Sequence, residues 1–190
     1  MTIDNKWGGA CAALAISLLS ACGGSSDDTD PYVGTWVSSC EVSGLHPDAR
    51  PTEDLKAIYR ITLTKQRADA LHFRIVQDLY PAAGCTGRPL ATHDNRADIN
   101  TYVFQGTKRI DGKEVDKVSV TMGALGGPQA EGTLVVDGIR YPGDFFISSV
   151  EGEKDVLSLT GTELRFGTGE AVDDEGYPNA LATTRVLRKL

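Results

Sequence analysis

Residues 55–65 read LKAIYRITLTK, and apolar side chains recur at every second position along this stretch. In an extended chain, successive side chains point to opposite faces, so residues two apart share a face. The shared apolar face consists of Ala57, Tyr59, Ile61 and Leu63. The alternation therefore predicts a β-strand with one face in the protein interior.

The same alternation continues along most of the chain. Residues 70–80, ALHFRIVQDLY, place Leu71, Phe73 and Ile75 on one face. Further strand-like runs are 101–110, 114–122, 132–136, 139–141, 144–150, 154–161, 162–167 and 180–190. Hairpin turns are expected at Asp111-Gly112, at Asp137-Gly138 and at residues 151–153. About eight to ten short antiparallel strands predict an all-β fold, either a closed barrel or a β-sandwich.

The first residues have the pattern of an export signal. Lys6 precedes an apolar run of about 13 residues, which is about 20 Å of helix at about 1.5 Å per residue. A membrane span needs about 20 residues, so this run fits a secretory signal better than a spanning helix. It ends at Leu19-Ser20-Ala21-Cys22, which resembles the bacterial lipobox, Leu-small-small-Cys.

This resemblance implies an exported lipoprotein. Residues 1–21 would be its signal peptide, and Cys22 would carry the lipid that attaches the chain to a membrane. Residues 22–31 are polar and acidic and read as a flexible tether, and residues 32–190 as a single domain. Gly23 stands where an Asp would retain the protein in the inner membrane, so the periplasmic side of the outer membrane is expected.

The net charge disfavours nucleic acid as a partner. The formal charge is −7, and it stays −7 after residues 1–21 are removed, because that segment carries one acid, Asp4, and one base, Lys6. An acidic domain disfavours nucleic acid.

Two cysteines, Cys40 and Cys85, remain in the predicted domain. An even pair in an oxidising compartment predicts a disulfide, with a reactive thiol or a metal site as alternatives.

Both ends of the predicted domain resemble lipocalin-like, or calycin, barrels. Residues 32–40, YVGTWVSSC, contain the Gly-x-Trp opening of that family as Gly34 and Trp36. Residues 183–190, TTRVLRKL, are similar to the last strand of fatty-acid-binding proteins, with Leu187 in place of a carboxylate-binding tyrosine. The resemblance implies that Trp36 closes one end of the barrel and that an arginine, Arg185 or Arg188, packs over its ring.

A second resemblance is to exported bacterial proteins reading Gly-Thr-Trp-x-Ser-x-Cys, followed by two strands and a Tyr shortly before a second Cys. Gly34 to Cys40, Tyr80 and Cys85 match that pattern. This resemblance implies a bond between Cys40 and Cys85, which would join the first strand to the turn after the third.

No motif assigns a catalytic activity. The glycine-rich residues 123–132 lack the Lys-Ser/Thr of a phosphate loop. His93 and Asp94 are adjacent and would point apart on an extended segment. We therefore expect no catalytic residues, no metal site and no cofactor, although an enzyme is a remaining alternative.

The function expected from this pattern is non-catalytic binding by a monomeric barrel. An eight-stranded barrel has room for one small ligand. Candidate residues for a small hydrophobic ligand are Tyr59, Ile61, Phe73, Ile75 and Leu159. The rival hypothesis is a protein-interaction, assembly or inhibitor module with a packed barrel, acting through the long connection 81–100.

Overall fold

The structure is a computed structural model that describes residues 29–43, 54–123, 134–136, 139–141 and 150–190. The predicted signal peptide, Cys22 and most of the predicted tether lie outside these residues, as does the expected turn at 137–138. No helix in the described ranges has the length and apolar character needed to cross a membrane.

Most of the described chain forms β-strands. It begins with a short 3-10 helix, Asp30–Tyr32, and continues through twelve strands in the described ranges. Their bounds are β1 (Gly34–Ser38), β2 (Glu41–Val42), β3 (Lys56–Arg67), β4 (Ala70–Tyr80), β5 (Ala91–Asn95), β6 (Thr101–Ile110), β7 (Lys113–Met122), β8 (Leu134–Val136), β9 (Ile139–Tyr141), β10 (Val150–Thr160), β11 (Glu163–Gly167) and β12 (Leu181–Lys189).

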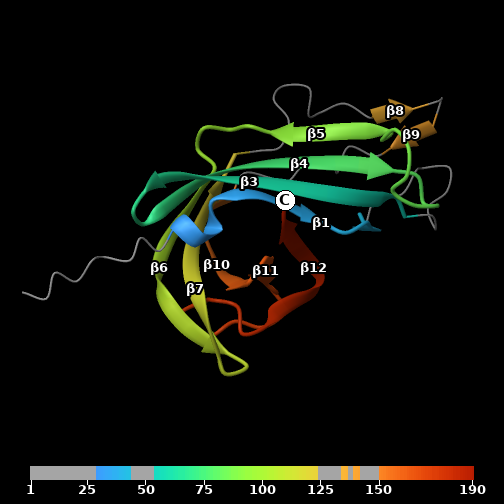
Figure 1. Ribbon diagram of the computed structural model, residues 1–190. Helices are drawn as coiled ribbons and strands as arrows, with labels where there is room; N and C mark the ends of the chain where they lie inside the picture. Colours follow the sequence, from blue (N-terminus) through green and yellow to red (C-terminus); the bar gives the residue numbers. More distant parts are fainter. Residues whose placement is uncertain (1–28, 44–53, 124–133, 137–138, 142–149) are drawn as a thin grey trace, which may run out of the picture.

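Eight of these strands close into an antiparallel barrel (Figure 1). In chain order they are β1, β3, β4, β6, β7, β10, β11 and β12, and each pairs with the next. The last strand, β12, pairs back onto β1 with Trp36 opposite Lys189. The predicted barrel is therefore confirmed, and its up-and-down order is consistent with a lipocalin-like domain.

The long strands β3 and β4 extend past the barrel wall. β2 pairs with the beginning of β3, and β5 pairs with the second half of β4 (Figure 1). β4 pairs with its barrel neighbour β6 only at Ala70, Leu71 and His72. Beyond His72 the wall opens between β4 and β6, and β5 takes the place beside β4. The predicted connection 81–100 thus contains a strand that the sequence pattern did not reveal.

The hairpin expected at residues 151–153 is wrong. β10 runs from Val150 to Thr160 without a turn, and its pairing with β7 shifts register between Val150 and Glu153. The glycine at 152 marks a β-bulge, in which one extra residue bends a strand without ending it. The hairpin at 111–112 is confirmed, because Ile110 and Lys113 are the last pair of β6 and β7.

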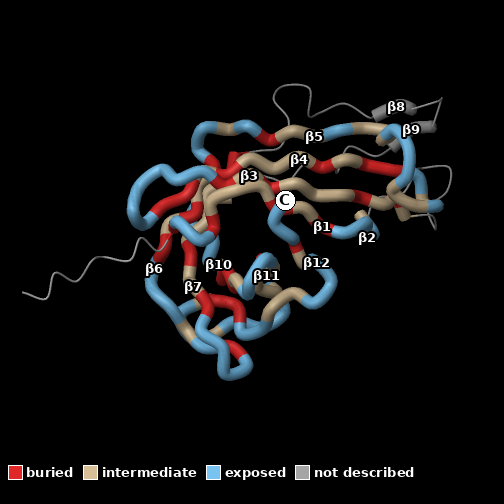
Figure 2. The backbone as a smooth tube through the Cα atoms, viewed as in Figure 1, coloured by how far each residue is buried: buried red, intermediate tan, exposed pale blue. Residues whose placement is uncertain are grey.

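One half of the barrel interior is tightly packed. The buried cluster contains the inward residues predicted from the alternation, Ile61, Leu63, Leu71 and Phe73, together with leucines of the later strands. It continues into the other half of the interior through Tyr102 and Met122. Leu157, Leu164 and Leu187 are each 0% exposed, as is Trp36 (Figure 2). Tyr32, the first residue of the predicted domain, belongs to the same cluster. Thr29 is also buried, so packing begins before the predicted end of the tether.

Trp36 lies at the closed end of this cluster. Its indole Nε1 donates a 2.7 Å hydrogen bond to the carbonyl oxygen of Tyr32. The Nζ of Lys189 lies 5.2 Å from the centre of its ring, in cation–π contact. Gly34 has φ of +138°, and a Cβ there would meet the Lys189 side chain at 2.8 Å. Gly34, Trp36 and Lys189 thus pack against one another where β1 pairs with β12.

Candidate functional site: a cavity in the open half of the barrel

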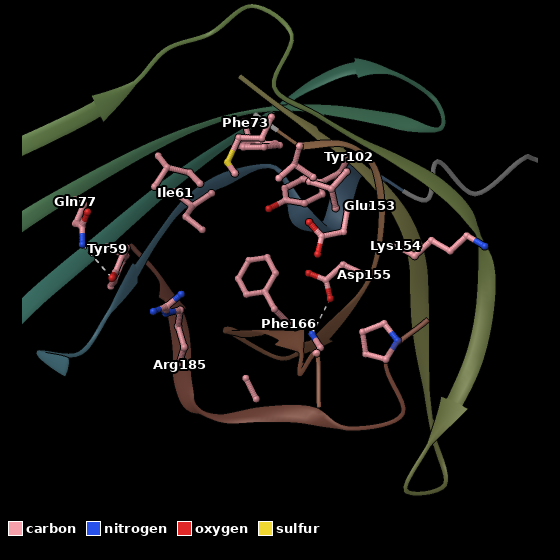
Figure 3. Close-up of a pocket in the computed structure, with 18 of the residues that line it drawn as sticks. Tyr59, Ile61, Phe73, Gln77, Tyr102, Glu153, Lys154, Asp155, Phe166 and Arg185 are labelled. Carbon is pink, nitrogen blue, oxygen red and sulfur yellow. Dashed lines mark hydrogen bonds between the residues drawn. The ribbon is translucent and has the colours of Figure 1, made fainter. Parts of the chain in front are cut away.

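The other half of the barrel contains a cavity of about 470 Å³ (Figure 3). Its walls come from β3, β4, β6, β7, β10, β11 and β12, and from the loop between β11 and β12. Much of the lining is apolar or aromatic, including Ile61, Phe73, Ile75, Tyr102, Met122 and Phe166. Protein interiors are close-packed, so an unfilled volume of this size is not an ordinary packing defect.

Aromatic rings line the deep part of the cavity. The rings of Phe73 and Tyr102 have centroids 4.4 Å apart, and those of Tyr102 and Phe166 are 6.4 Å apart. Burial raises the pKa of the Tyr102 phenol far above its ordinary value, and the nearby carboxylate of Asp155 acts in the same direction. Tyr102 is therefore a neutral wall residue.

Two carboxyl groups on β10 face the cavity from one side (Figure 3). The Oδ1 of Asp155 accepts hydrogen bonds from the backbone N–H groups of Val156, at 2.7 Å, and Gly167, at 3.0 Å. The pKa of Asp155 is raised to about 6, mainly by burial. The two hydrogen bonds lower this pKa, but by less than burial raises it, and the charge of Glu153 raises it further. Glu153 is the more exposed of the two and lies nearer the opening.

Glycine is required at position 167 for the carboxylate to fit. A Cβ there would lie 2.5 Å from the ring of Pro178 and 2.7 Å from Asp155 Oδ1. The backbone of β11 can therefore approach Asp155 closely enough to donate its N–H. The loop between β11 and β12 is in turn fastened to β6, because Lys108 donates to Asp173 and, at 2.9 Å, to the carbonyl oxygen of Pro178.

The opposite wall presents Arg185, Tyr59 and Gln77 (Figure 3). The guanidinium carbon of Arg185 is 4.3 Å from the centre of the Tyr59 ring, and its Nε donates a 2.8 Å hydrogen bond to Glu41. Gln77 donates to the Tyr59 hydroxyl at 3.0 Å. The pKa of Tyr59 is raised, mainly by burial. The expectation that Arg185 packs over Trp36 is therefore corrected.

The strand register explains that correction. Trp36 is opposite Lys189 in the pairing of β1 with β12. Arg185 comes four residues earlier on β12, which is roughly 13 Å along the strand. It therefore reaches the cavity instead of Trp36. Arg188, the other arginine considered, lies on the surface and pairs with Glu163 at 3.1 Å.

The structure separates the five predicted ligand residues into two groups. Tyr59, Ile61, Phe73 and Ile75 line the cavity. Leu159 does not line the cavity, although it packs against the buried cluster as Ile75 does. Sequence reasoning did not select Asp155, Tyr102 and Phe166. Asp155 is two residues before the buried Leu157, so both side chains point to the same face of the strand. The alternation of residues 154–161 already contained this signal.

The cysteine pair is confirmed as a disulfide. Cys40 and Cys85 are bonded with their Cα atoms 5.7 Å apart. The bond joins the connection between β1 and β2 to the connection between β4 and β5. It therefore ties the extended ends of the β3–β4 pair together on the side of the barrel that carries Tyr59 and Gln77.

The remaining candidates for chemistry lie outside the cavity. Asp94 forms ion pairs with Arg74 and Arg96, each at 2.5 Å. These arginines lower the pKa of Asp94 to about 2, so it is a structural anion on β5. Burial lowers the pKa of the neighbouring His93. Within the described ranges, no group of three or more His, Cys, Asp or Glu residues is arranged to bind a metal ion.

No protein-family model, curated protein or solved structure matches this chain. The barrel and its cavity are therefore the features that bear on function.

Proposed function

We propose that the protein is a lipid-anchored, non-catalytic binding protein of the bacterial envelope that takes up a small hydrophobic ligand in its barrel. The observation that carries this proposal is the cavity of about 470 Å³ inside the closed barrel. Small-molecule pockets typically measure about 300–1,000 Å³ and combine apolar walls with a few polar groups. The aromatic rings and the separate polar walls fit that description.

The anchor belongs to the proposal on sequence grounds. Leu19-Ser20-Ala21-Cys22 has the order of a lipobox, and Gly23 favours the outer membrane. The described residues begin with Thr29, which is buried, and six residues, 23–28, lie between Cys22 and Thr29 in the sequence. A Cys22→Ser variant is expected to leave the membrane fraction in cell fractionation. Processing and membrane attachment equal to the native chain would contradict the anchor.

A second candidate function is protein binding along the free edge of β5. This strand is the last in the sheet order, with β4 as its neighbour in the described sheet. An open edge can accept a strand from another chain through backbone hydrogen bonds. β5 has only five residues and bears the ion-paired Asp94, features that commonly protect an edge against pairing. The cavity is therefore the stronger support.

The test of ligand binding uses the neutral fluorescent probe N-phenyl-1-naphthylamine with the full-length protein. Micromolar uptake corresponds to about 8 kcal/mol of binding free energy. Ile75→Trp is expected to weaken uptake at least tenfold, because Ile75 lines the cavity and a larger ring would fill it. Val76→Trp on the opposite face of β4 is the matched control. No uptake by a stably folded native protein would refute the proposal.

A further inference from the structure

The cavity has an electrostatic asymmetry that the proposed function does not use. Glu153 and Asp155 both face it from β10, and they are two residues apart on one strand (Figure 3). In the described part of the chain, no lysine or arginine pairs with Asp155. Its hydrogen bonds there come from the backbone N–H groups of Val156 and Gly167.

The two basic residues that border the cavity are already engaged elsewhere. Lys154 points away from it, donates to the carbonyl oxygen of Glu175 and lies 5.2 Å from the centre of the Tyr177 ring (Figure 3). Arg185 is paired with Glu41 at 2.8 Å and stacked on Tyr59. The carboxylates on β10 therefore face the cavity without a cationic neighbour from its described walls, in a chain of formal charge −7.

Aromatic rings accompany these carboxylates. Tyr102 and Phe166 line the same cavity as Asp155 and are drawn near it in Figure 3. The faces of aromatic rings attract ammonium cations, and carboxylates attract them more strongly. Carboxylates beside ring faces form a combination that suits a cation, whereas an anion would meet two like charges.

From this arrangement we infer that the cavity binds an amphipathic cation, an ammonium group attached to an apolar body. The ammonium would contact Asp155 and Glu153, and the apolar body would pack on Ile61, Phe73 and Ile75. The inference rests on the proposed function, because it names the class of ligand for the same cavity. A buried carboxylate without a counter-ion is costly, and a ligand ammonium supplies the missing charge.

The experiment compares three ligands of equal chain length by isothermal titration calorimetry on the full-length protein at pH 7.5. They are decylamine, which is cationic, 1-decanol, which is neutral, and decanoate, which is anionic. Decylamine is expected to bind at least tenfold more tightly than 1-decanol, with decanoate the weakest. The common alkyl chain isolates the contribution of the head group.

Two variants locate the effect. Asp155→Asn and Glu153→Gln are each expected to weaken decylamine binding by about five- to tenfold and to leave 1-decanol binding within twofold of the native value. Glu114→Gln is the matched control, since it removes one negative charge from an exposed position on β7 outside the cavity lining. It should change neither affinity, which separates contact with the cavity carboxylates from attraction to the acidic surface.

The outcomes separate the two proposals. If 1-decanol binds as tightly as decylamine, or decanoate binds most tightly, the cavity is a ligand site but the inference about cations is overturned. If Glu114→Gln weakens decylamine binding as much as Asp155→Asn does, the preference for the cation comes from the acidic surface. The inference is then likewise overturned. If none of the three ligands binds, the proposed function falls and the inference falls with it.

Discussion

The two halves of the barrel use the same strands for different purposes. In the closed half, inward leucines and Trp36 fill the space between the strands, with Leu63 1% exposed and Trp36 and Leu157 0% exposed. In the open half, the inward positions of those strands carry aromatic rings and charged groups around a cavity. The closed half has the packing of a core, whereas the open half retains a carboxylate whose pKa is raised by burial.

The geometry of the wall explains why the halves differ. β4 pairs with β6 only at Ala70, Leu71 and His72, so the wall is tight there and widens beyond. Side-chain hydrogen bonds connect the end of β5 to the residues that flank β6 and β7. Asn100 donates to Asn95 at 2.9 Å, and Asn95 donates to the carbonyl oxygen of Gly123 at 3.0 Å. Stability is thus expected to come mainly from the closed half and selectivity from the open half.

Trp36→Ala should break the closed half and produce the largest loss. Removing a fully buried aromatic side chain costs about 3–5 kcal/mol, because it leaves a cavity in a packed core. Phe166→Ala is the comparison from the open half and should cost roughly half as much, since Phe166 already borders empty volume. Urea denaturation measures both. Equal losses would show that the two halves contribute alike.

Loss of the Cys40–Cys85 bond should be the next largest effect. The bond spans 45 residues, and closing a loop of that length contributes about 4 kcal/mol in the chain-entropy model, with typical measured values of about 2–4. The double variant Cys40→Ser, Cys85→Ser should show this loss in its free energy of unfolding. The native protein treated with a reductant is the control. An unchanged midpoint in both would mean that the bond does not restrain the chain.

Asp155→Asn should stabilise the protein, in contrast to the first two changes. The carboxyl pKa is near 3.8 in the unfolded chain and about 6 in the folded one. The folded state therefore binds the proton more tightly, so the free energy of unfolding falls as the pH rises from about 4 to 6 and stays lower above. Asparagine avoids that ionisation and keeps an oxygen for both N–H groups.

The expected gain for Asp155→Asn is roughly 1–3 kcal/mol at pH 7, with no difference from the native protein below pH 4. Denaturation at pH 3.5 and pH 7 measures the contrast. A gain that is the same at both pH values would show that packing changed and ionisation did not. Stabilisation together with loss of decylamine binding would mark Asp155 as a group that lowers stability in return for selectivity.

Gly34→Ala should have the smallest effect of the four, roughly 1–2 kcal/mol of destabilisation. The φ of +138° disfavours a side chain, and the new Cβ would press on Lys189. Combining it with Lys189→Ala separates the two causes in a double-mutant cycle. If the cost of Gly34→Ala persists unchanged without the lysine side chain, backbone strain explains it. A stabilising Gly34→Ala would contradict the close approach.

The alternation of apolar residues predicted much of the fold and part of the site. It assigned Ile61, Leu63, Leu71 and Phe73 to an inner face, and the structure places all four in the same cluster. It failed at residues 151–153, where a local glycine signal suggested a turn. Pairing of β10 with β7 and β11 along most of its length makes a bulge the better solution there.

The sequence by itself predicted which residues face inward, favoured a bond between the two cysteines, and predicted that many short strands would form an all-β barrel or sandwich. Period-two alternation and turn residues are local properties, so they can be read without knowing the fold. The tertiary structure alone decided how far along the barrel each inward residue lies. Leu157 and Asp155 are two residues apart and point to the same face of β10. Leu157 is fully buried, whereas Asp155 faces the cavity. Strand register and the opening between β4 and β6 fix that difference, because they depend on pairings between distant segments.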